Sequence, residues 1–135
     1  MGTAGSWYQE FPWARKINPH INSPENLKKG TGRNVVAFLD KGAKNTIVIG
    51  AHYDHLGHGD VPGSLHVGEE MIHNGADDNA SGIAAMLMMA EVLKDKPSTN
   101  NFLFIAFSGE ELGLFGSKYY AENPTIDLKL SLIHI

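Results

Sequence analysis

Hydrophobic residues along this chain occur first in short continuous runs and then with a helical period. The apolar runs at residues 34–39, 46–50 and 102–107 have the length and the β-branched or aromatic content of strands buried in a sheet. From residue 80 to residue 94, apolar side chains recur every three or four positions, which predicts a helix. A polar, glycine-rich stretch at 56–75 separates this helix from the strand before it.

The remainder of the chain continues the alternation of strands and helices. A second helix is expected after Gly109 and before Pro124, and residues 128–135 have the character of a further strand. Strand, strand, helix, strand, helix, strand is the order typical of an α/β domain. We therefore predict a three-layer α/β/α fold around a mixed, mostly parallel sheet. Because the chain ends on an apolar strand without a closing helix, the sequence also predicts that this domain is incomplete.

Residues 1–33 show neither the strand period nor the helix period. This part of the chain contains two tryptophans and three prolines, and we interpret it as an irregular lead-in segment. Its aromatic side chains would anchor it on the edge of the core. The chain is accordingly divided into residues 1–33 and a partial domain over residues 34–135.

Composition and charge limit the chemistry that is available. The 135 residues are 42% hydrophobic and 19% charged, as in ordinary globular proteins. A net charge of −4 gives no reason to expect nucleic acid or an anionic membrane as a partner. The chain has no cysteine, so thiolate ligands and disulfides are excluded. Seven histidines and fifteen acidic residues leave a nitrogen-and-oxygen metal site as the chemistry to consider.

Polar residues gather at three places where a predicted strand or helix begins or ends. HYDH at 52–55 follows the second strand, GADDN at 75–79 precedes the first helix, and SGEE at 108–111 follows the third strand. Each group alone has an ordinary structural explanation, such as a helix cap or an exposed pair of acids. Open α/β sheets, however, place their sites at strand ends. Three such groups on one sheet therefore favour a metal site.

The first group can bind a metal through its histidine. His52 and Asp54 lie two residues apart on extended chain, so their side chains leave the same side of the strand. A carboxylate in this position can fix the imidazole tautomer towards a metal. The same spacing also occurs in non-haem iron sites with two histidines and one carboxylate, so this group does not identify the metal by itself.

The other two groups each contain adjacent acids. Placing Asp77 beside Asp78 near buried strand ends brings like charges together, and a divalent cation would offset their repulsion. Glu110 and Glu111 follow a strand at a turn, where neighbouring side chains point in different directions. One glutamate can then bind a metal while the other moves a proton to or from water.

Taken together, the segments AHYDHLG, NGADDNASG and FSGEELGLFGS resemble the M28 family of zinc metallo-aminopeptidases. The resemblance covers approximately residues 34–124. It implies a zinc-exopeptidase-like fold, in which residues 34–135 are part of a peptidase catalytic domain. It also implies a hydrolase that removes N-terminal residues from peptides with a free N-terminus, and zinc as the cofactor, with two ions in the complete enzyme.

The resemblance assigns a role to each matching residue. His52, Asp77 and Glu111 would be metal ligands, with Asp77 bridging the two ions. Glu110 would be the catalytic general base and acid, and Asp54 would complete the catalytic set by orienting His52. The family also implies a cis peptide bond between the paired acids, here Asp77 and Asp78.

The resemblance assigns no role to five further histidines: His55, His58, His66, His73 and His134. We expect most of the first four to lie in solvent or behind the ligands, with contact to the metal left open for each of them, and His134 to be structural. Two family ligands have no counterpart in this sequence, an aspartate expected just past Ile135 and a histidine much further on. Each zinc would then keep two protein ligands, fewer than the three of ordinary catalytic sites.

Several consequences follow for the chain by itself. It is expected to bind zinc weakly and to have little or no peptidase activity. A sheet that stops early would expose an apolar edge, which predicts self-association. By the same resemblance, a full-length parent protein would be exported to the periplasm or secreted.

Three alternatives remain beside the aminopeptidase. A single-zinc acyltransferase resembling glutaminyl cyclase would share the fold, although two pairs of acids fit a two-metal hydrolase better. A non-haem iron oxygenase would use His52 and Asp54, although its usual scaffold is an all-β barrel rather than alternating strands and helices. A catalytically dead binding domain of the same fold is the third alternative.

Overall fold

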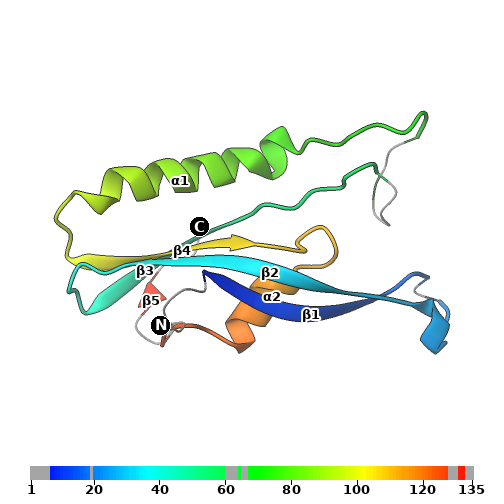
Figure 1. Cartoon of the computed structure of the whole chain (residues 1–135), viewed down its shortest axis with the longest axis horizontal. Coiled ribbons are helices and arrows are strands. Elements are labelled where there is room, and N and C mark those ends of the chain that lie inside the picture. Colours follow the sequence, from blue (N-terminus) through cyan, green and yellow to red (C-terminus); the bar gives the residue numbers. More distant parts are fainter. Residues whose placement is uncertain (1–6, 19, 60–63, 65–66, 128–130, 133–135) are drawn as a thin grey trace.

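The computed structural model describes residues 7–18, 20–59, 64, 67–127 and 131–132 (Figure 1). Its elements are β1 (Tyr8–Lys16), a short 3-10 helix (Pro24–Asn26), β2 (Leu27–Leu39), β3 (Asn45–His52), an irregular helical turn (Ala76–Ala80), α1 (Ser81–Lys94), β4 (Asn100–Phe107), α2 (Phe115–Glu122) and β5 (Ser131–Leu132). From residue 34 onward, these strands and helices follow the predicted order. The predicted strand at 128–135 is described only at Ser131–Leu132, because its other residues lie outside the described part of the chain.

The five strands form one mixed sheet in the order β1-β2-β4-β3-β5. β2 pairs antiparallel with both β1 and β4, whereas β3 pairs parallel with β4 and β5. The sheet is mixed, as predicted, but the prediction that it is mostly parallel is wrong, because the antiparallel pairings join more residues. The physical reason is the short connection between β1 and β2, since neighbouring strands joined by a short link can only pair antiparallel.

The prediction of an irregular segment over residues 1–33 is wrong for the described part of that range. β1 and the first half of β2 form a long antiparallel ribbon, in which Phe11 pairs with Gly32 and Trp13 pairs with Gly30. A Cβ atom at Gly32 would lie 2.3 Å from the Phe11 ring, so the glycines make room for aromatic side chains that cross the ribbon. The prolines and glycines that resemble strand breakers in the sequence are therefore compatible with this edge ribbon.

The two helices pack against opposite faces of the central strand β4. Alternate residues of a strand point to opposite faces. On one face, Phe102 and Phe104 join a cluster with Met86 of α1. On the other, Leu103 and Ile105 pack with Tyr120 of α2. These four β4 residues are all buried, as predicted for a strand covered on both sides.

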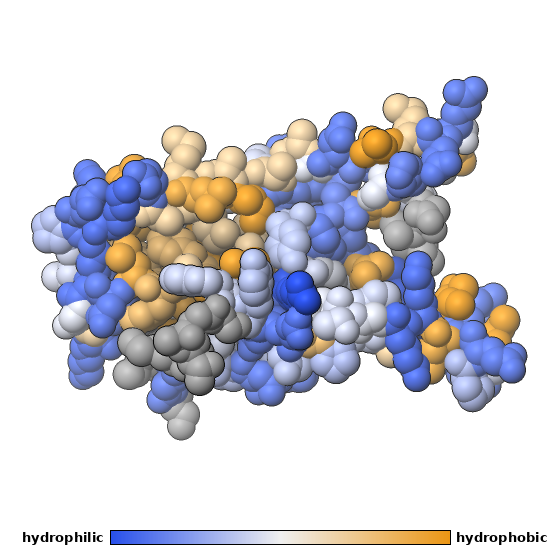
Figure 2. All heavy atoms as spheres, in the orientation of Figure 1, coloured by the Kyte–Doolittle hydropathy of each residue, from blue (hydrophilic) through white to orange (hydrophobic). Residues whose placement is uncertain are grey.

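Helix α1 connects β3 to its parallel neighbour β4, and its outer side is apolar. Leu87 is 61% exposed, Met88 70% and Val92 53%. Figure 2 shows apolar side chains gathered over α1 and over the sheet beneath it. Within the described residues, neither helix is long and apolar enough to cross a membrane.

A buried asparagine ties β2 to the loop that follows β4. Asn34 is 0% exposed, and its amide group donates to the carbonyl oxygen of Gly116 at 2.9 Å and to the side chain of Gln9 at 3.0 Å. Its side-chain oxygen accepts a bond from the backbone N–H of Ser108 at 3.2 Å. Both ends of segment 108–116 are thus held by one side chain.

Replacing Asn34 with leucine should destabilise the protein while keeping the branched shape of the side chain. Asn34→Leu leaves the Ser108 N–H and the Gly116 carbonyl without their buried partner, which should cost about 2–4 kcal/mol of unfolding free energy. The measurement is urea denaturation. The control Asn22→Leu, at an exposed residue whose side chain accepts a hydrogen bond from the exposed side chain of Lys16, should change stability by less than about 0.5 kcal/mol. An unchanged midpoint for Asn34→Leu would contradict this account.

Candidate metal and catalytic site

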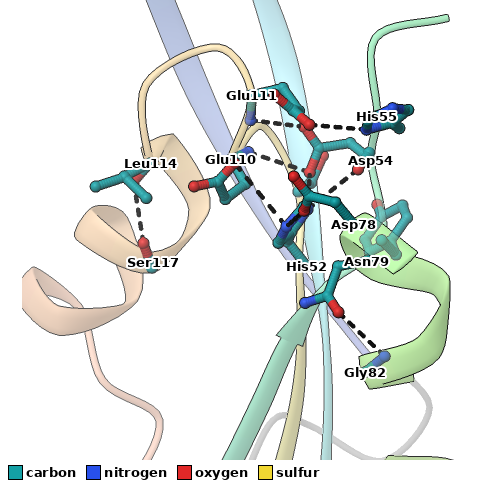
Figure 3. A network of polar contacts seen from close by, with 12 residues as sticks. His52, Asp54, His55, Asp78, Asn79, Gly82, Glu110, Glu111, Leu114 and Ser117 are labelled. Atoms are coloured by element: carbon teal, nitrogen blue, oxygen red, sulfur yellow. Dashed lines mark hydrogen bonds and ion pairs between the residues drawn. The ribbon is translucent and has the colours of Figure 1, made fainter. Parts of the chain in front are cut away.

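The site forms where β3 and β4 end side by side. Their parallel register places His52 opposite Phe107, so both chains leave the sheet at the same edge. The Tyr53 N–H continues the pairing by donating to the Phe107 carbonyl at 3.0 Å. As a result, the polar groups at 52–55 and 108–111 meet, and the turn before α1 closes the third side (Figure 3).

His52 lies at the centre of these groups. Its side chain is 12% exposed, and its Nε2 atom is 2.9 Å from Oδ1 of Asp78. A carboxylate oxygen of Glu110 lies 4.0 Å from the same nitrogen. Nδ1 faces the backbone carbonyl of Asp54 at 3.1 Å, while the Asp54 carboxylate is further away at 3.8 Å. The ring is therefore oriented chiefly by main chain, with Nε2 directed at the acidic groups.

The Asp54 carboxylate binds the loop that carries the paired glutamates. Oδ1 accepts the backbone N–H of Glu110 at 3.1 Å, and Oδ2 accepts that of Glu111 at 3.2 Å. Asp54 thus links the end of β3 to the turn after β4. The sequence predicted only that the Asp54 carboxylate orients His52. Its bonds to the backbone of Glu110 and Glu111 join residues far apart in the sequence, so they could not be predicted from residue spacing.

The turn before α1 brings Asp78 into the site. Asp78 and Asn79 have non-helical backbone angles, and the bond between them is a cis peptide. The expected cis bond between Asp77 and Asp78 is therefore misplaced by one residue. In the same turn, the side chain of Asn79 accepts the N–H of Gly82 at 3.0 Å, at the start of α1.

Asp77, the predicted bridging ligand, takes a different position. Its backbone carbonyl accepts the Ser81 hydroxyl at 2.8 Å, as part of the first turn of the helix. Asp78 is the acid that faces His52. The adjacency of the two acids in the sequence could not tell which carboxylate would face His52.

A second histidine of the cluster, His55, also contacts a carboxylate. Nδ1 of His55 lies 2.8 Å from Oε1 of Glu111, and both side chains are about one-fifth exposed. His55, Asp78 and Glu111 each offer one ligand atom, and these atoms lie within 4.8 Å of one another. Asp78 therefore adjoins His52 on one side and the His55–Glu111 pair on the other.

Two of the remaining histidines, His58 and His73, have other contacts. His58 forms an exposed pair with Glu70 at 3.1 Å, and the ring of His73 is centred 6.4 Å from that of His55. His66 and His134 lie outside the described residues. A cavity of about 640 Å³ also borders Asp54 and His55, and its far wall comes from the β1–β2 ribbon, including Trp13 and Thr31.

The donor set fits zinc. Imidazole nitrogen and carboxylate oxygen are both ligands that zinc accepts in proteins. Four of the five predicted site residues come together here: His52, Asp54, Glu110 and Glu111. The aspartate that faces His52 is Asp78 rather than Asp77. Several carboxylates and two imidazoles lie close together here, and a divalent cation between them would offset the repulsion of the negative charges.

Comparison with known proteins places this geometry in a family. The family model described as "Peptidase family M28" matches residues 34–133. A curated relative, the probable lipoprotein aminopeptidase LpqL of Mycobacterium tuberculosis, is 37% identical over 97 residues, which cover 70% of this chain and 17% of the relative.

Solved structures agree with the sequence relatives. BSAP, a zinc aminopeptidase from Bacillus subtilis, matches at 37% identity with a TM-score of 0.58, over 78% of this chain and 24% of that one. A glutaminyl cyclase from Bacteroides thetaiotaomicron matches with a TM-score of 0.62 over 91% of this chain and 45% of that one, but at 19% identity it supports the fold alone. The chain thus spans less than half the length of these proteins. From the match over residues 34–133, the chain belongs to peptidase family M28.

Proposed function

We propose that this chain forms part of the catalytic site of a zinc-dependent aminopeptidase. The observation that carries the proposal is the convergence of His52, Asp78, Glu110 and Glu111 at the shared edge of β3 and β4, in a chain of the M28 family. The named aminopeptidases among its relatives support peptide hydrolysis, and BSAP supports zinc as the metal. The substrate would be a peptide with a free N-terminus.

The metal ligands within this chain would be His52, Asp78 and Glu111. We place Asp78 in the bridging role predicted for Asp77, because Asp78 adjoins His52 and lies in the same ligand group as Glu111. A carboxylate with two oxygens can serve two ions, and the complete enzyme would hold two zinc ions. Bound zinc would supply a more acidic water and polarise the scissile carbonyl.

Glu110 has the position of a general base beside this ligand set. Its carboxylate is 35% exposed and 4.0 Å from the His52 ring, so it borders the ligands without being enclosed among them. It would accept the proton of the attacking water and return it to the departing amine. The backbone of Glu110 is fixed by Asp54, which would keep its carboxylate directed at the reacting atoms.

Two alternatives within the fold differ in their support. The glutaminyl-cyclase-like function rests on matches below 25% identity, whereas relatives named aminopeptidase match above 30%. A catalytically dead domain would have no need of the Asp54 contacts that fix both glutamates. We therefore favour peptide hydrolysis over both.

The setting of the complete protein is also a proposal. We expect the whole protein to have a three-layer α/β/α catalytic domain and to be exported, in keeping with the lipoprotein name of its mycobacterial relative. The 135-residue chain alone should have little activity and should self-associate through its open sheet edge or the apolar side of α1.

The decisive experiment is hydrolysis of aminoacyl p-nitroanilides with added zinc. It should be run on the 135-residue chain and on the product of the complete reading frame. In the complete protein, Glu110→Gln should lower kcat by about 10²–10⁴-fold with unchanged zinc content, because only the proton acceptor is lost. The control Glu122→Gln, at the exposed end of α2, should retain full activity.

Two results would overturn the proposal. One is hydrolysis that persists after metal removal by a chelator, and the other is full activity in Glu110→Gln. A parallel assay with a peptide that has N-terminal glutamine separates the cyclase alternative. Cyclisation without release of any N-terminal residue would favour that function instead.

Removing one charge from Asp54 should weaken metal binding without unfolding the chain. Asp54→Asn replaces a carboxylate oxygen that accepts an N–H with an amide that cannot, so the loop carrying Glu111 loses one anchor. Loss of such an outer contact typically lowers metal affinity by about 10–100-fold. Zinc titration calorimetry measures the change.

The matched control is Asp40→Asn, which alters an acid that caps an exposed turn by accepting the N–H of Gly42 at 2.8 Å. This variant should bind zinc like the wild type. Equal zinc affinity in Asp54→Asn and the wild type would show that the carboxylate contributes nothing to the metal site.

A further inference from the structure

We propose that His55 is itself a zinc ligand, and that His55, Asp78 and Glu111 form a single-ion site contained entirely within these 135 residues. This inference rests on the proposed function in one respect, namely that the cluster binds zinc. It goes further because it assigns metal binding to a residue without a family role. It also replaces the expectation of weak binding through two ligands per ion.

The first argument is the ligand count. The three side chains offer one imidazole nitrogen and two carboxylate oxygens within 4.8 Å of one another. Catalytic zinc sites normally have three protein ligands and leave one position for water or substrate. With His55, this chain reaches three ligands for one ion, whereas Asp78 and Glu111 alone would supply two.

The second argument is the placement of the His55 ring. Nδ1 of His55 lies 2.8 Å from Oε1 of Glu111. Two ligands of one tetrahedral zinc, with bonds of about 2.0–2.2 Å, lie roughly 3.3 Å apart, so a small outward movement of either side chain would suffice. The two partners come from different loops, after β3 and after β4, and the strand register fixes both loops.

The third argument is that the chain reserves space for this ring. Gly75 has φ of +60°, and a Cβ atom there would lie 2.6 Å from Cγ of His55. Gly75 directly precedes the turn that carries Asp78. The glycine therefore lets the His55 ring lie against that turn, on the side where Asp78 and Glu111 meet.

A hydrogen bond alone could account for the His55–Glu111 contact, in which case His55 would only position Glu111. The two roles predict different losses of affinity. Removal of an outer-contact residue costs about 10–100-fold, so removal of a direct ligand should cost more than about 100-fold. The two roles also differ in whether His55 forms a bond to the metal.

The test is zinc titration of the 135-residue chain, compared with His55→Ala and with the control His58→Ala. His58 lies in the same loop and forms an exposed pair with Glu70. The wild type and His58→Ala should bind one zinc ion with equal affinity, and His55→Ala should bind it more than about 100-fold more weakly. Circular dichroism checks that the variants are folded.

A direct readout uses the wild-type chain loaded with cadmium-113. Scalar coupling between the metal and the ring protons of His55 would demonstrate the bond and does not depend on how a variant folds. The inference falls if a bound ion shows no coupling to His55, if His55→Ala binds zinc like the wild type or only 10–100-fold more weakly, or if the wild-type chain binds no zinc.

None of these results decides the proposed function, which depends on hydrolysis by the complete protein and on Glu110. Zinc binding that is lost in His52→Ala but retained in His55→Ala would support the family ligands and exclude His55. Failure of hydrolysis in the complete protein, with cadmium coupling to His55 intact, would retain the metal site and exclude the peptidase.

Discussion

The parallel register between β3 and β4 is the constraint on which the rest of the site depends. It sets His52 opposite Phe107, and every later contact follows from the two chains leaving the sheet at one edge. A slip of one residue would turn each side chain of β3 to the opposite face. The register is strongly specified because Ile49 of β3 and Phe104 of β4 are buried in the same cluster. Apolar packing in the sheet therefore determines where the polar chemistry lies.

Two polar side chains then fix the backbone of segment 108–116, which follows β4. Asn34 binds the backbone at Ser108 and Gly116, and Asp54 binds it at Glu110 and Glu111. A turn that presents two acids would otherwise be free to separate their like charges. Side chain to backbone bonds hold the main chain while leaving both glutamate carboxylates available. The short loop is thus rigid in its backbone and still offers its acids to a ligand.

The sequence was most informative where one physical effect dominates. Continuous apolar runs located β3 and β4 because strands covered on both faces have no polar alternation to obscure them. Residues 8–33 were misjudged because the ribbon depends on aromatic rings packed across glycines of the partner strand, a pairing that exists only once the register is known. The element order was predictable, whereas the antiparallel share of the sheet was not.

In the site, too, the roles of single residues depend on contacts that the sequence alone does not show. The three motifs indicated which turns meet at the sheet edge, but not that Asp78 rather than Asp77 faces His52, because this depends on the non-helical backbone at Asp78 and Asn79. His55 carried no signal by itself, since its significance comes from Glu111, which is 56 positions away. Local chemistry can be inferred from spacing, but the direction of a side chain in an irregular turn depends on the three-dimensional fold.

The contacts of Asp54 have a consequence for observing this site in solution. The amide protons of Glu110 and Glu111 lie in a loop, where exchange with solvent deuterium is ordinarily fast, yet both are bound to one carboxylate. Their exchange can slow only while the ends of β3 and β4 remain together. These two protons thus act as an intrinsic reporter of an assembled site, and they can be followed without substrate or catalysis.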